Sequence, residues 1–294
     1  MSVAATSEGP LETGRRRGVW RGRIFVALLL FSMAVGFLAL GTLFFDVLQK
    51  GIAYVDPVLL TNPPSSNPDI AGARPAILAT LYLGVLLILF TVPIGVGTAI
   101  YLEEYADRNR WYNRLLELNI QNLAAVPSIV YGILGLAFLV RGLGLGRVLL
   151  AGALILTLLV LPTVIIAARE AIRAVPGSIR EGAYALGATQ WQVISRQVLP
   201  AAIPGIATGS ILALSRAIGE TAPLILIGAL TYITFNPTVM GPFTALPVQI
   251  YNWTRLPDPK FKALAAAAII VLLIMVLLLN AGAIWLRNRY QKRW

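Results

Sequence analysis

Residues 180–200 read REGAYALGATQWQVISRQVLP, and this polar stretch separates two long apolar segments of the chain. Within it, Glu181-Gly182-Ala183 is followed after three residues by Gly187, and after nine more by Gln197-Val198-Leu199-Pro200. A membrane protein needs such a stretch when a protein in the cytoplasm must push on it. We therefore interpret it as a lever between two membrane spans.

The local chemistry of this stretch predicts a helical hairpin. Ser178 and Glu181 have the spacing of a capping box, which would start a short helix over about 179–186. Gly187 can adopt a positive φ and turn the chain. A second short helix, carrying Trp191, would then run back to the closing Leu-Pro. The alternative is an interfacial amphipathic hairpin anchored by Trp191, which explains neither the Glu-to-Gly spacing nor the Leu-Pro.

The composition predicts a membrane protein. Of the 294 residues, 57% are hydrophobic and 13% are charged, whereas an ordinary soluble domain has about 25% charged residues. A soluble fold of this size could not bury so much apolar surface, so we expect an all-α polytopic membrane protein. Apolar segments of spanning length predict six transmembrane helices, at residues 24–48, 76–100, 118–140, 148–168, 206–233 and 263–286.

The chain has a net charge of +11, and its basic residues are distributed unevenly between the two sides of the membrane in the predicted topology. With the N-terminus inside, the cytoplasmic segments hold 16 of the 24 Lys and Arg residues and the external segments hold 7, while Arg216 lies inside a span. This excess is the positive-inside pattern of an even number of spans. It predicts that both termini are cytoplasmic, that the basic residues contact anionic membrane lipid, and that nucleic acid is not a partner.

Cysteine and histidine are both absent, which excludes several kinds of site. Disulfides, Cys/His zinc sites, haem ligation by His and Ser-His or Cys-His nucleophiles all need them. The segment 9–16 is the nearest approach to a phosphate-binding loop, and it lacks the required Lys-Ser/Thr pair. We predict no catalytic residue, no metal and no cofactor, so ATP would be hydrolysed by another chain.

Changes in composition divide the chain into three parts. Residues 1–23 are predicted to form a polar, disordered cytoplasmic tail. Residues 24–75 would form the first transmembrane helix and an external loop, and the apolar run is too long for a cleaved signal peptide, whose core has about 7–15 residues. Residues 76–290 would form one transmembrane domain, with the lever in the loop 169–204.

The fifth predicted span carries two charges, Arg216 and Glu220. Arg216 lies ten residues after Ile206, which is about 15 Å along a helix and the middle of a hydrocarbon core of about 30 Å. An arginine at that depth costs at least about 2.5–3.5 kcal/mol. Glu220 follows one turn later on the same face, together with the small residues Gly209 and Ala213. Either the pair neutralises itself and locks the bundle, or the guanidinium faces an aqueous path and binds an oxyanion.

These stretches together resemble a known family. The spacing in 180–200 is similar to the cytoplasmic coupling loop of ABC-importer permeases, with Gly182 in place of an Ala and Gln197 in place of an Ile. Four stretches of the chain resemble the A-type permease subunits of bacterial phosphate-specific ABC importers. They are residues 101–106, 117–132, 180–189 and 215–224. The runs VPSIVYG and RAIGETAP narrow the resemblance to phosphate, and it covers roughly residues 70–290.

The resemblance implies a fold, a function and partners. The fold would be that of a type I (MetI-like) ABC-importer permease in the bacterial inner membrane, and the function would be inorganic phosphate import. The partners would be a second, C-type permease, two cytoplasmic ATPase subunits and an extracytoplasmic phosphate-binding protein. Arg216 and Glu220 would line the substrate path. The ATPase would be contacted by Glu181, Gly182, Ala183, Gly187, Leu199 and Pro200.

Three alternatives remain open. The chain could be an ion-coupled secondary carrier or channel in which Glu220 relays protons, although the lever argues against this. It could be an intramembrane enzyme, although no general base is evident. Within the importer hypothesis, the oxyanion could be sulfate, which only the family motifs disfavour.

Overall fold

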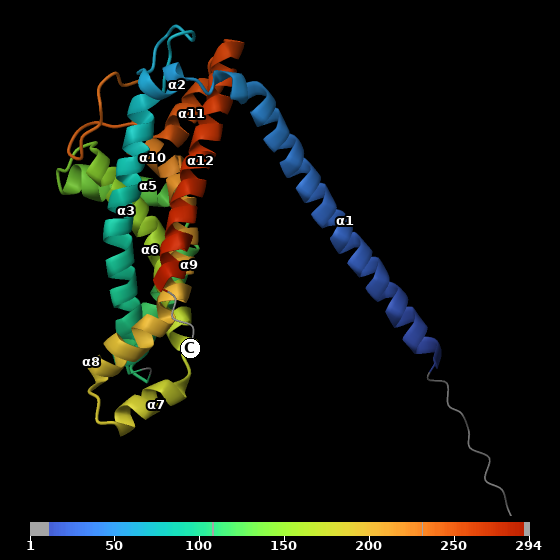
Figure 1. The fold of residues 1–294 in the computed structure, drawn as a ribbon, viewed down its shortest axis with the longest axis vertical. Helices are drawn as coiled ribbons and strands as arrows, with labels where there is room; N and C mark the ends of the chain where they lie inside the picture. The colour runs from blue at the N-terminus through green and yellow to red at the C-terminus, as the bar shows by residue number, and fades with distance from the viewer. Residues whose placement is uncertain (1–11, 108, 231, 291–294) are drawn as a thin grey trace, which may run out of the picture. The chain divides into compact units, whose positions relative to one another are not determined.

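The computed structural model describes residues 12–107, 109–230 and 232–290, and all regular structure in these ranges is helical (Figure 1). The chain divides into two compact units, Met1–Gln49 and Lys50–Trp294. The first unit contains nearly all of α1 (Glu12–Gly51), whose apolar side chains from Ile24 to Phe45 are largely exposed. Because α1 begins at Glu12, the prediction of a disordered tail is wrong for residues 12–23, and residues 1–11 lie outside the described ranges.

The second unit is a bundle of long helices with short ones at its ends and in its interior. Its helices are η1 (Ile52–Tyr54), α2 (Pro57–Thr61), α3 (Arg74–Ile100), η2 (Tyr101–Tyr105), α4 (Trp111–Ala124), α5 (Ser128–Gly135), η3 (Leu136–Gly142), α6 (Leu149–Arg173), α7 (Gly177–Ala185), α8 (Gln190–Val193), η4 (Ile194–Val198), α9 (Leu199–Ile218), α10 (Ala222–Leu226), α11 (Leu246–Thr254) and α12 (Pro259–Tyr290). In Figure 1, α7 and α8 lie at one end of this unit and α2 and α11 at the other. We call these the α7 end and the α11 end.

Five helical segments of the described chain are long and apolar enough to cross a membrane. They are Gly22–Tyr54, Arg74–Tyr105, Leu149–Arg173, Gln190–Ile218 and Pro259–Trp285. A sixth candidate is the pair Trp111–Ala124 and Ser128–Gly142, whose two helices are bent by 105°. The six predicted spans therefore all have helical counterparts, but two of them are broken within the predicted limits.

The predicted span 118–140 is not one straight helix. α4 ends at Ala124, and the chain turns before α5 begins at Ser128, with Pro127 at the N-cap of α5. Proline has no backbone N–H, and it disfavours the helical conformation of the residue before it, so a helix breaks readily at this point. In Figure 1, α5 lies across the bundle, whereas α3 runs along it.

The predicted span 206–233 is also wrong in its limits. Its helix is continuous from Gln190 and stops at Ile218, with Gly219 as the C-cap. Pro223 then starts the short helix α10, which packs against α5. An ideal Cβ placed on Gly132 of α5 would lie 2.8 Å from Cα of Pro223, so the two broken spans meet closely.

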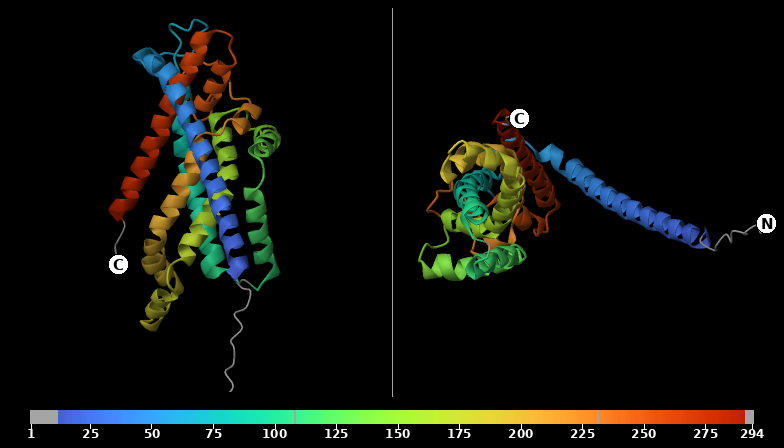
Figure 2. Two further views of the ribbon diagram at one scale, coloured as in Figure 1. Left: turned by 90° about the vertical axis from the view of Figure 1, so that its right-hand side faces the viewer. Right: turned by 90° about the horizontal axis from the view of Figure 1, so that it is seen from below.

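Helix α6 holds the bundle together because it packs against both α3 and α9. Small residues make this possible. An ideal Cβ on Gly209 of α9 would lie 2.4 Å from Cβ of Ala167, and one on Gly205 would lie 2.7 Å from Cβ of Ala171. Figure 2 shows the long helices of the second unit running side by side.

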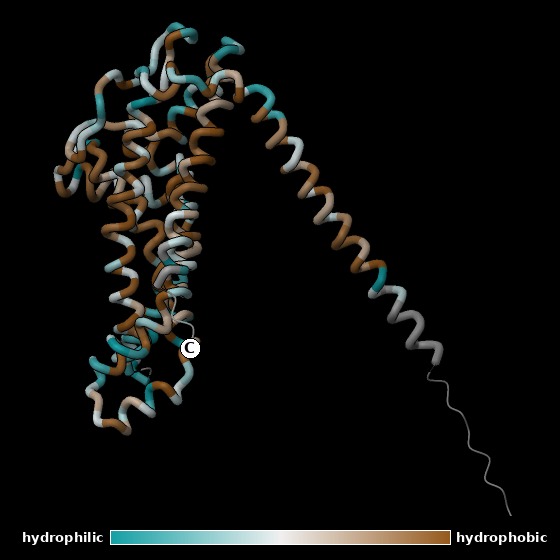
Figure 3. The backbone as a smooth tube through the Cα atoms, in the orientation of Figure 1, coloured by the Kyte–Doolittle hydropathy of each residue, from teal (hydrophilic) through white to brown (hydrophobic). Residues whose placement is uncertain are grey.

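The apolar core of the second unit has three parts. One lies around α6 in the middle of the bundle, one at the α11 end, and one at the α7 end. Figure 3 shows hydrophobic residues along the length of the bundle and hydrophilic residues gathered at its two ends. This pattern is the one that a bilayer requires, because polar groups are costly in its hydrocarbon core.

The contact between α6 and α9 predicts different outcomes for two glycine substitutions. Gly209→Val should lower stability by about 1–3 kcal/mol, because the added side chain overpacks against Ala167. Gly97→Val is the matched control, since Gly97 is exposed and its Cβ would have no atom within 4 Å. Thermal unfolding of the purified variants measures both. Equal melting temperatures would contradict this account of the α6–α9 contact.

Candidate functional site

A helical hairpin forms the α7 end. α7 finishes at Ala185, and Gly187 turns the chain with a φ of +80°. The amide of Gly187 donates to the carbonyl of Tyr184 (2.9 Å), and the amide of Ala188 donates to that of Ala183 (3.1 Å). These two bonds form a Schellman motif, which satisfies carbonyls that the helix end leaves open. The predicted helix–glycine–helix turn is therefore present.

Two details of the predicted hairpin are wrong. Ser178 lies inside α7, whose N-cap is Pro176 with no capping side chain, so the predicted Ser178–Glu181 capping box does not form. The capping box that does form joins Thr189 and Gln192 at the start of α8. The second helix also does not end at the Leu-Pro pair, because α8, η4 and α9 follow without a break and Pro200 sits in the first turn of α9. Pro200 lies inside this continuous helical run, directly after the π-helix η4, and its missing N–H removes one backbone hydrogen bond from the helix.

The residues predicted to contact an ATPase fall into two groups. Ala183 and Leu199 pack against the apolar cluster at the α7 end, whereas Glu181, Gly182 and Gly187 are exposed. Large apolar side chains are also exposed on the hairpin: Tyr184, Trp191 and Leu186, the last of them 90% exposed. The hairpin is thus anchored on one side and presents an apolar tip on the other.

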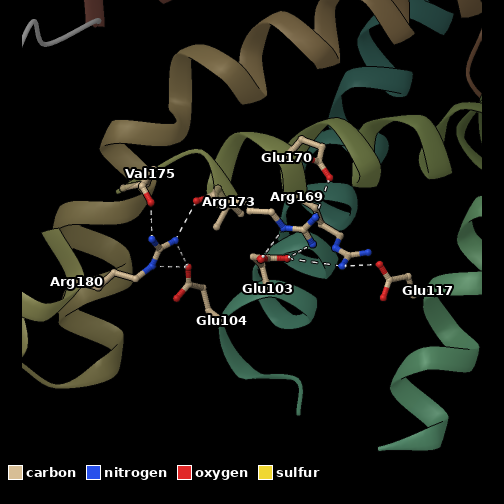
Figure 4. Close-up of polar contacts among 9 residues, drawn as sticks. Glu103, Glu104, Glu117, Arg169, Glu170, Arg173, Val175 and Arg180 are labelled. Atoms are coloured by element: carbon tan, nitrogen blue, oxygen red, sulfur yellow. Dashed lines mark hydrogen bonds and ion pairs between the residues drawn. The ribbon is translucent and has the colours of Figure 1, made fainter. Parts of the chain in front are cut away.

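A cluster of charged side chains from α4, α6, α7 and η2 lies at the α7 end (Figure 4). Nη2 of Arg169, on α6, is 3.0 Å from Oε1 of Glu117 on α4 and 3.6 Å from Oε2 of Glu103 in η2. The Glu103 side chain is only 4% exposed and that of Arg169 only 9%. Buried charges are stable only when they are paired. These pairs therefore hold α4, α6 and the end of the α3 span together.

Arg173 extends this cluster by one helical turn of α6. Its Nε and Nη2 each lie 3.1 Å from an oxygen of Glu103, which makes a bidentate contact. Its Nη1 lies 3.2 Å from Glu170. Glu103 thus forms ion pairs with two arginines, Arg169 and Arg173, which are four residues apart on one face of α6.

Arg180, in the first half of α7, makes the second connection. Its Nη2 lies 2.8 Å from Oε1 of Glu104 and 2.9 Å from the carbonyl oxygen of Ile172, and its Nη1 lies 2.6 Å from that of Val175. The two carbonyls belong to the C-terminal turn of α6 and the residues after it, where the helix leaves acceptors open. One guanidinium therefore links α7, the end of α6 and η2.

Arg216 and Glu220 lie at the point where α9 stops. Nε of Arg216 is 3.6 Å from Oε1 of Glu220, and the two side chains are 72% and 18% exposed. An ideal Cβ on Gly84 would be 3.7 Å from Cδ1 of Ile218, and Gly84 lies ten residues into α3. The break in α9 is thus about 15 Å from the α11 end of α3 and lies inside the bundle.

Arg216 shares the exposed face of α9 with Gly205, Thr208 and Leu212. This face continues onto α12, because Ser215 hydrogen-bonds to the Asn280 side chain. Nη1 of Arg287 donates to the hydroxyl of Thr208 over 2.7 Å. Two separate polar contacts between α9 and α12 therefore lie between Arg216 and the α7 end, with the exposed Leu212 on the same face of α9.

The charged cluster was not predicted from the sequence. The charged residues of 101–111 are typical of any solvated connection. The arginines of α6 were used only to predict the topology of the chain in the membrane. One usable signal was present, because Arg169 and Arg173 are spaced four residues apart and share a helix face. Two adjacent carboxylates at the end of a span, in a chain with 13 acidic residues, were a second signal.

The chain is similar in sequence to bacterial transport proteins. The family described as "Binding-protein-dependent transport system inner membrane component" matches residues 91–294. A "Phosphate transport system permease protein PstA" from Yersinia pestis is 34% identical over 277 residues, which cover 92% of this chain and 92% of that protein. A "Probable ABC transporter permease protein YqgI" from Bacillus subtilis (strain 168) is 32% identical over 264 residues, 85% of this chain and 90% of that protein.

Solved structures share the fold. A bacterial ABC transporter involved in the import of the acidic polysaccharide alginate superimposes with a TM-score of 0.65 at 20% identity, covering 94% of this chain and 99% of that one. A chain of the inward-facing MetNI methionine ABC transporter gives a TM-score of 0.58 at 18% identity, covering 73% of this chain and 92% of that one. The predicted fold of an ABC-importer permease is therefore confirmed.

The buried cluster makes a prediction about stability. Arg169→Leu should destabilise the protein by about 3 kcal/mol, because it leaves carboxylates without their buried partner. Lys260→Met is the control, since the pair of Lys260 with Asp69 is exposed and its loss should leave stability nearly unchanged. Thermal unfolding in detergent measures both variants. Equal losses would show that the Arg169 pairs contribute no more than a surface ion pair.

Proposed function

We propose the function of this chain from one premise: it belongs to the family of binding-protein-dependent transport system inner membrane components. The chain is the permease subunit of an ATP-driven ABC importer for inorganic phosphate. One observation carries the choice of phosphate, which is that relatives named as phosphate transport permeases match nearly the whole chain. The hairpin at the α7 end and the arginine at the break of α9 are what such a role requires.

The hairpin is the part that meets the ATPase. The apolar tip formed by Tyr184, Leu186 and Trp191 is exposed on a rigid turn, and the segment 169–204 anchors this turn to α6 and α9. Two ATPase subunits hydrolyse ATP in the cytoplasm, and this chain has no phosphate-binding loop of its own. The α7 end is therefore cytoplasmic, as the excess of basic residues in the predicted cytoplasmic segments also favours.

The substrate path runs along the exposed face of α9. Gly205, Thr208, Leu212 and Arg216 lie on this face, where a second permease of the C type completes a channel. Backbone that leaves a helix within the membrane is tolerated where it lines a cavity or is buried in protein. The break after Ile218 meets this condition, and Arg216 and Glu220 stand beside it.

The remaining partners follow from the same arrangement. An exported phosphate-binding protein delivers substrate at the α11 end, which faces away from the ATPase. Membrane lipid surrounds the exposed apolar side chains of α1, α3 and α12. Residues 76–290 act as the permease domain, and both termini lie in the cytoplasm of a bacterium with the chain in its inner membrane.

Uptake of radioactive phosphate tests this function. Proteoliposomes that hold the complete complex should import phosphate when ATP is enclosed with the ATPase subunits and binding protein is added outside. Unlabelled phosphate should compete and sulfate should not. Competition by sulfate would show that the importer is not specific for phosphate. Import that stops with an uncoupler while ATP stays high would instead support an ion-coupled carrier.

The turn at Gly187 predicts a coupling defect. Gly187→Val should lower ATP-driven uptake and ATPase association, because a β-branched residue does not tolerate a φ of +80°. Gly97→Val is the matched control, since Gly97 lies within α3, outside the hairpin, without a positive φ, and its Cβ would meet no atom within 4 Å. Co-purification of the ATPase and uptake per complex are the measurements. Unchanged coupling in Gly187→Val would rule out the lever.

Arg216 is predicted to serve phosphate passage. Arg216→Lys should impair uptake, because lysine keeps the charge but loses the planar fork that binds an oxyanion at two points. Arg216→Gln should impair it further. Uptake is normalised to the amount of intact complex. A loss of complex that accounted for the whole loss of uptake would make Arg216 a structural residue.

A further inference from the structure

We infer that Glu104 and Arg180 are positioning residues that fix the hairpin on the end of the α3 span, so that a movement of α7 is carried into α3 and α6. This inference rests on the proposed function and names the contact through which the lever acts. Glu104 and Arg180 are 76 residues apart, so their contact is a tertiary connection between two separate spans. Neither residue touches the substrate path described above.

The hydrogen bonds between Arg180 and its partners fix the orientation of the guanidinium group. Nε and Nη2 of Arg180 both point at Oε1 of Glu104, at 3.3 Å and 2.8 Å. Nη1 and Nη2 also donate to the carbonyls of Val175 and Ile172. All three guanidinium nitrogens are thus used, and the side chains are only 21% and 9% exposed. Hydrogen bonds of this kind constrain orientation as well as distance.

Glu104 holds both halves of the hairpin. Its carboxylate binds Arg180 of α7, and its backbone carbonyl accepts from Nε2 of Gln190 in α8 at 2.7 Å. α7 and α8 are therefore tied to the same residue of η2. A force on the hairpin tip is delivered to the end of the α3 span at this residue.

Apolar packing alone would attach the hairpin without orienting it. Ile179, Ala183 and Ala188 pack against the cluster at the α7 end. Hydrophobic attraction is non-directional, so these contacts keep the hairpin attached but resist sliding weakly. When the Glu104–Arg180 contact is lost, the apolar packing and the Gln190 hydrogen bond should keep the hairpin in place, but a movement of α7 should move α3 less.

Loss of the Glu104–Arg180 contact should reduce the coupling of transport to ATP hydrolysis without reducing assembly of the complex. The decisive quantity is the amount of phosphate imported per ATP hydrolysed. Arg180→Gln and Glu104→Ala should each lower this ratio about fivefold or more, which is the lower end of typical coupling effects. The double variant should be no worse than Arg180→Gln alone, since Arg180→Gln already removes the contact with Glu104. Arg180→Lys should recover little, because lysine cannot reach the carboxylate and two carbonyls with a fixed fork.

The matched control is Arg110→Gln. Arg110 pairs with Asp107 at 3.6 Å, and both side chains are exposed. This pair lies near η2 but joins neighbouring residues of one loop, so its loss should leave the ratio unchanged. An equal fall of uptake and ATP hydrolysis in Arg180→Gln, with the ratio preserved, would overturn the inference.

A second measurement does not depend on transport. The chain has no cysteine, so spin labels can be attached at Tyr101→Cys and Ser178→Cys, which are exposed sites on η2 and α7 outside the apolar tip. The distribution of distances between the labels should be narrow in the parent complex and broader in Arg180→Gln. An unchanged distribution would overturn the positioning role. If the parent complex failed to import phosphate, the proposed function would be refuted, and these distances would still decide whether Glu104 and Arg180 position α7.

Discussion

The close approach of α6 to α3 and α9 is the constraint on which the rest of the structure depends. Helices in a bilayer gain no hydrophobic energy by leaving lipid for one another, so van der Waals contact must hold them. Gly205 and Gly209 supply that contact because they leave room for Ala171 and Ala167. With α6 fixed in this way, its C-terminal turn brings Arg169 and Arg173 to a defined place beside the ends of α3 and α4.

At the α7 end, single charged residues each contact more than one helix. Glu103 pairs with two arginines of α6, and Glu104 contacts both α7 and α8. Burial makes each pair costly to break, since the partner left behind would be an uncompensated charge. The buried ion pairs that stabilise the α7 end also make it stiff. A stiff end suits the proposed role of the hairpin, which is to transmit movement between an ATPase and the membrane helices.

The two broken spans place irregular backbone inside the bundle. The α4–α5 break and the α9–α10 break face each other, since α10 packs against α5. Lipid would not tolerate open backbone groups, so such breaks belong where protein or a water-filled path surrounds them. Arg216 stands at one of these breaks and on the open face of α9. Its desolvation cost is lower there than at the lipid-facing middle of a straight helix.

The sequence by itself determined the class of the protein, the number of helical segments that could span a membrane, and the turn at Gly187. Apolar length and the need for a positive φ are local properties, so single stretches reveal them. The capping box at Ser178 and the end of the fifth span were predicted wrongly, and the span 118–140 is broken into two helices. Pro176, Pro127 and Gly219 stand at these three helix limits, but a proline or glycine in an apolar stretch does not by itself fix whether a helix kinks or stops there.

Only the tertiary structure decided which charges meet. Glu103 and Glu104 could have been solvated, and the arginines of α6 and α7 could have faced lipid headgroups. The packing of α6 brings together residues about 70 positions apart, as in the Glu103–Arg173 pair. No local pattern encodes such a contact, because its energy depends on the burial and geometry of both partners at once.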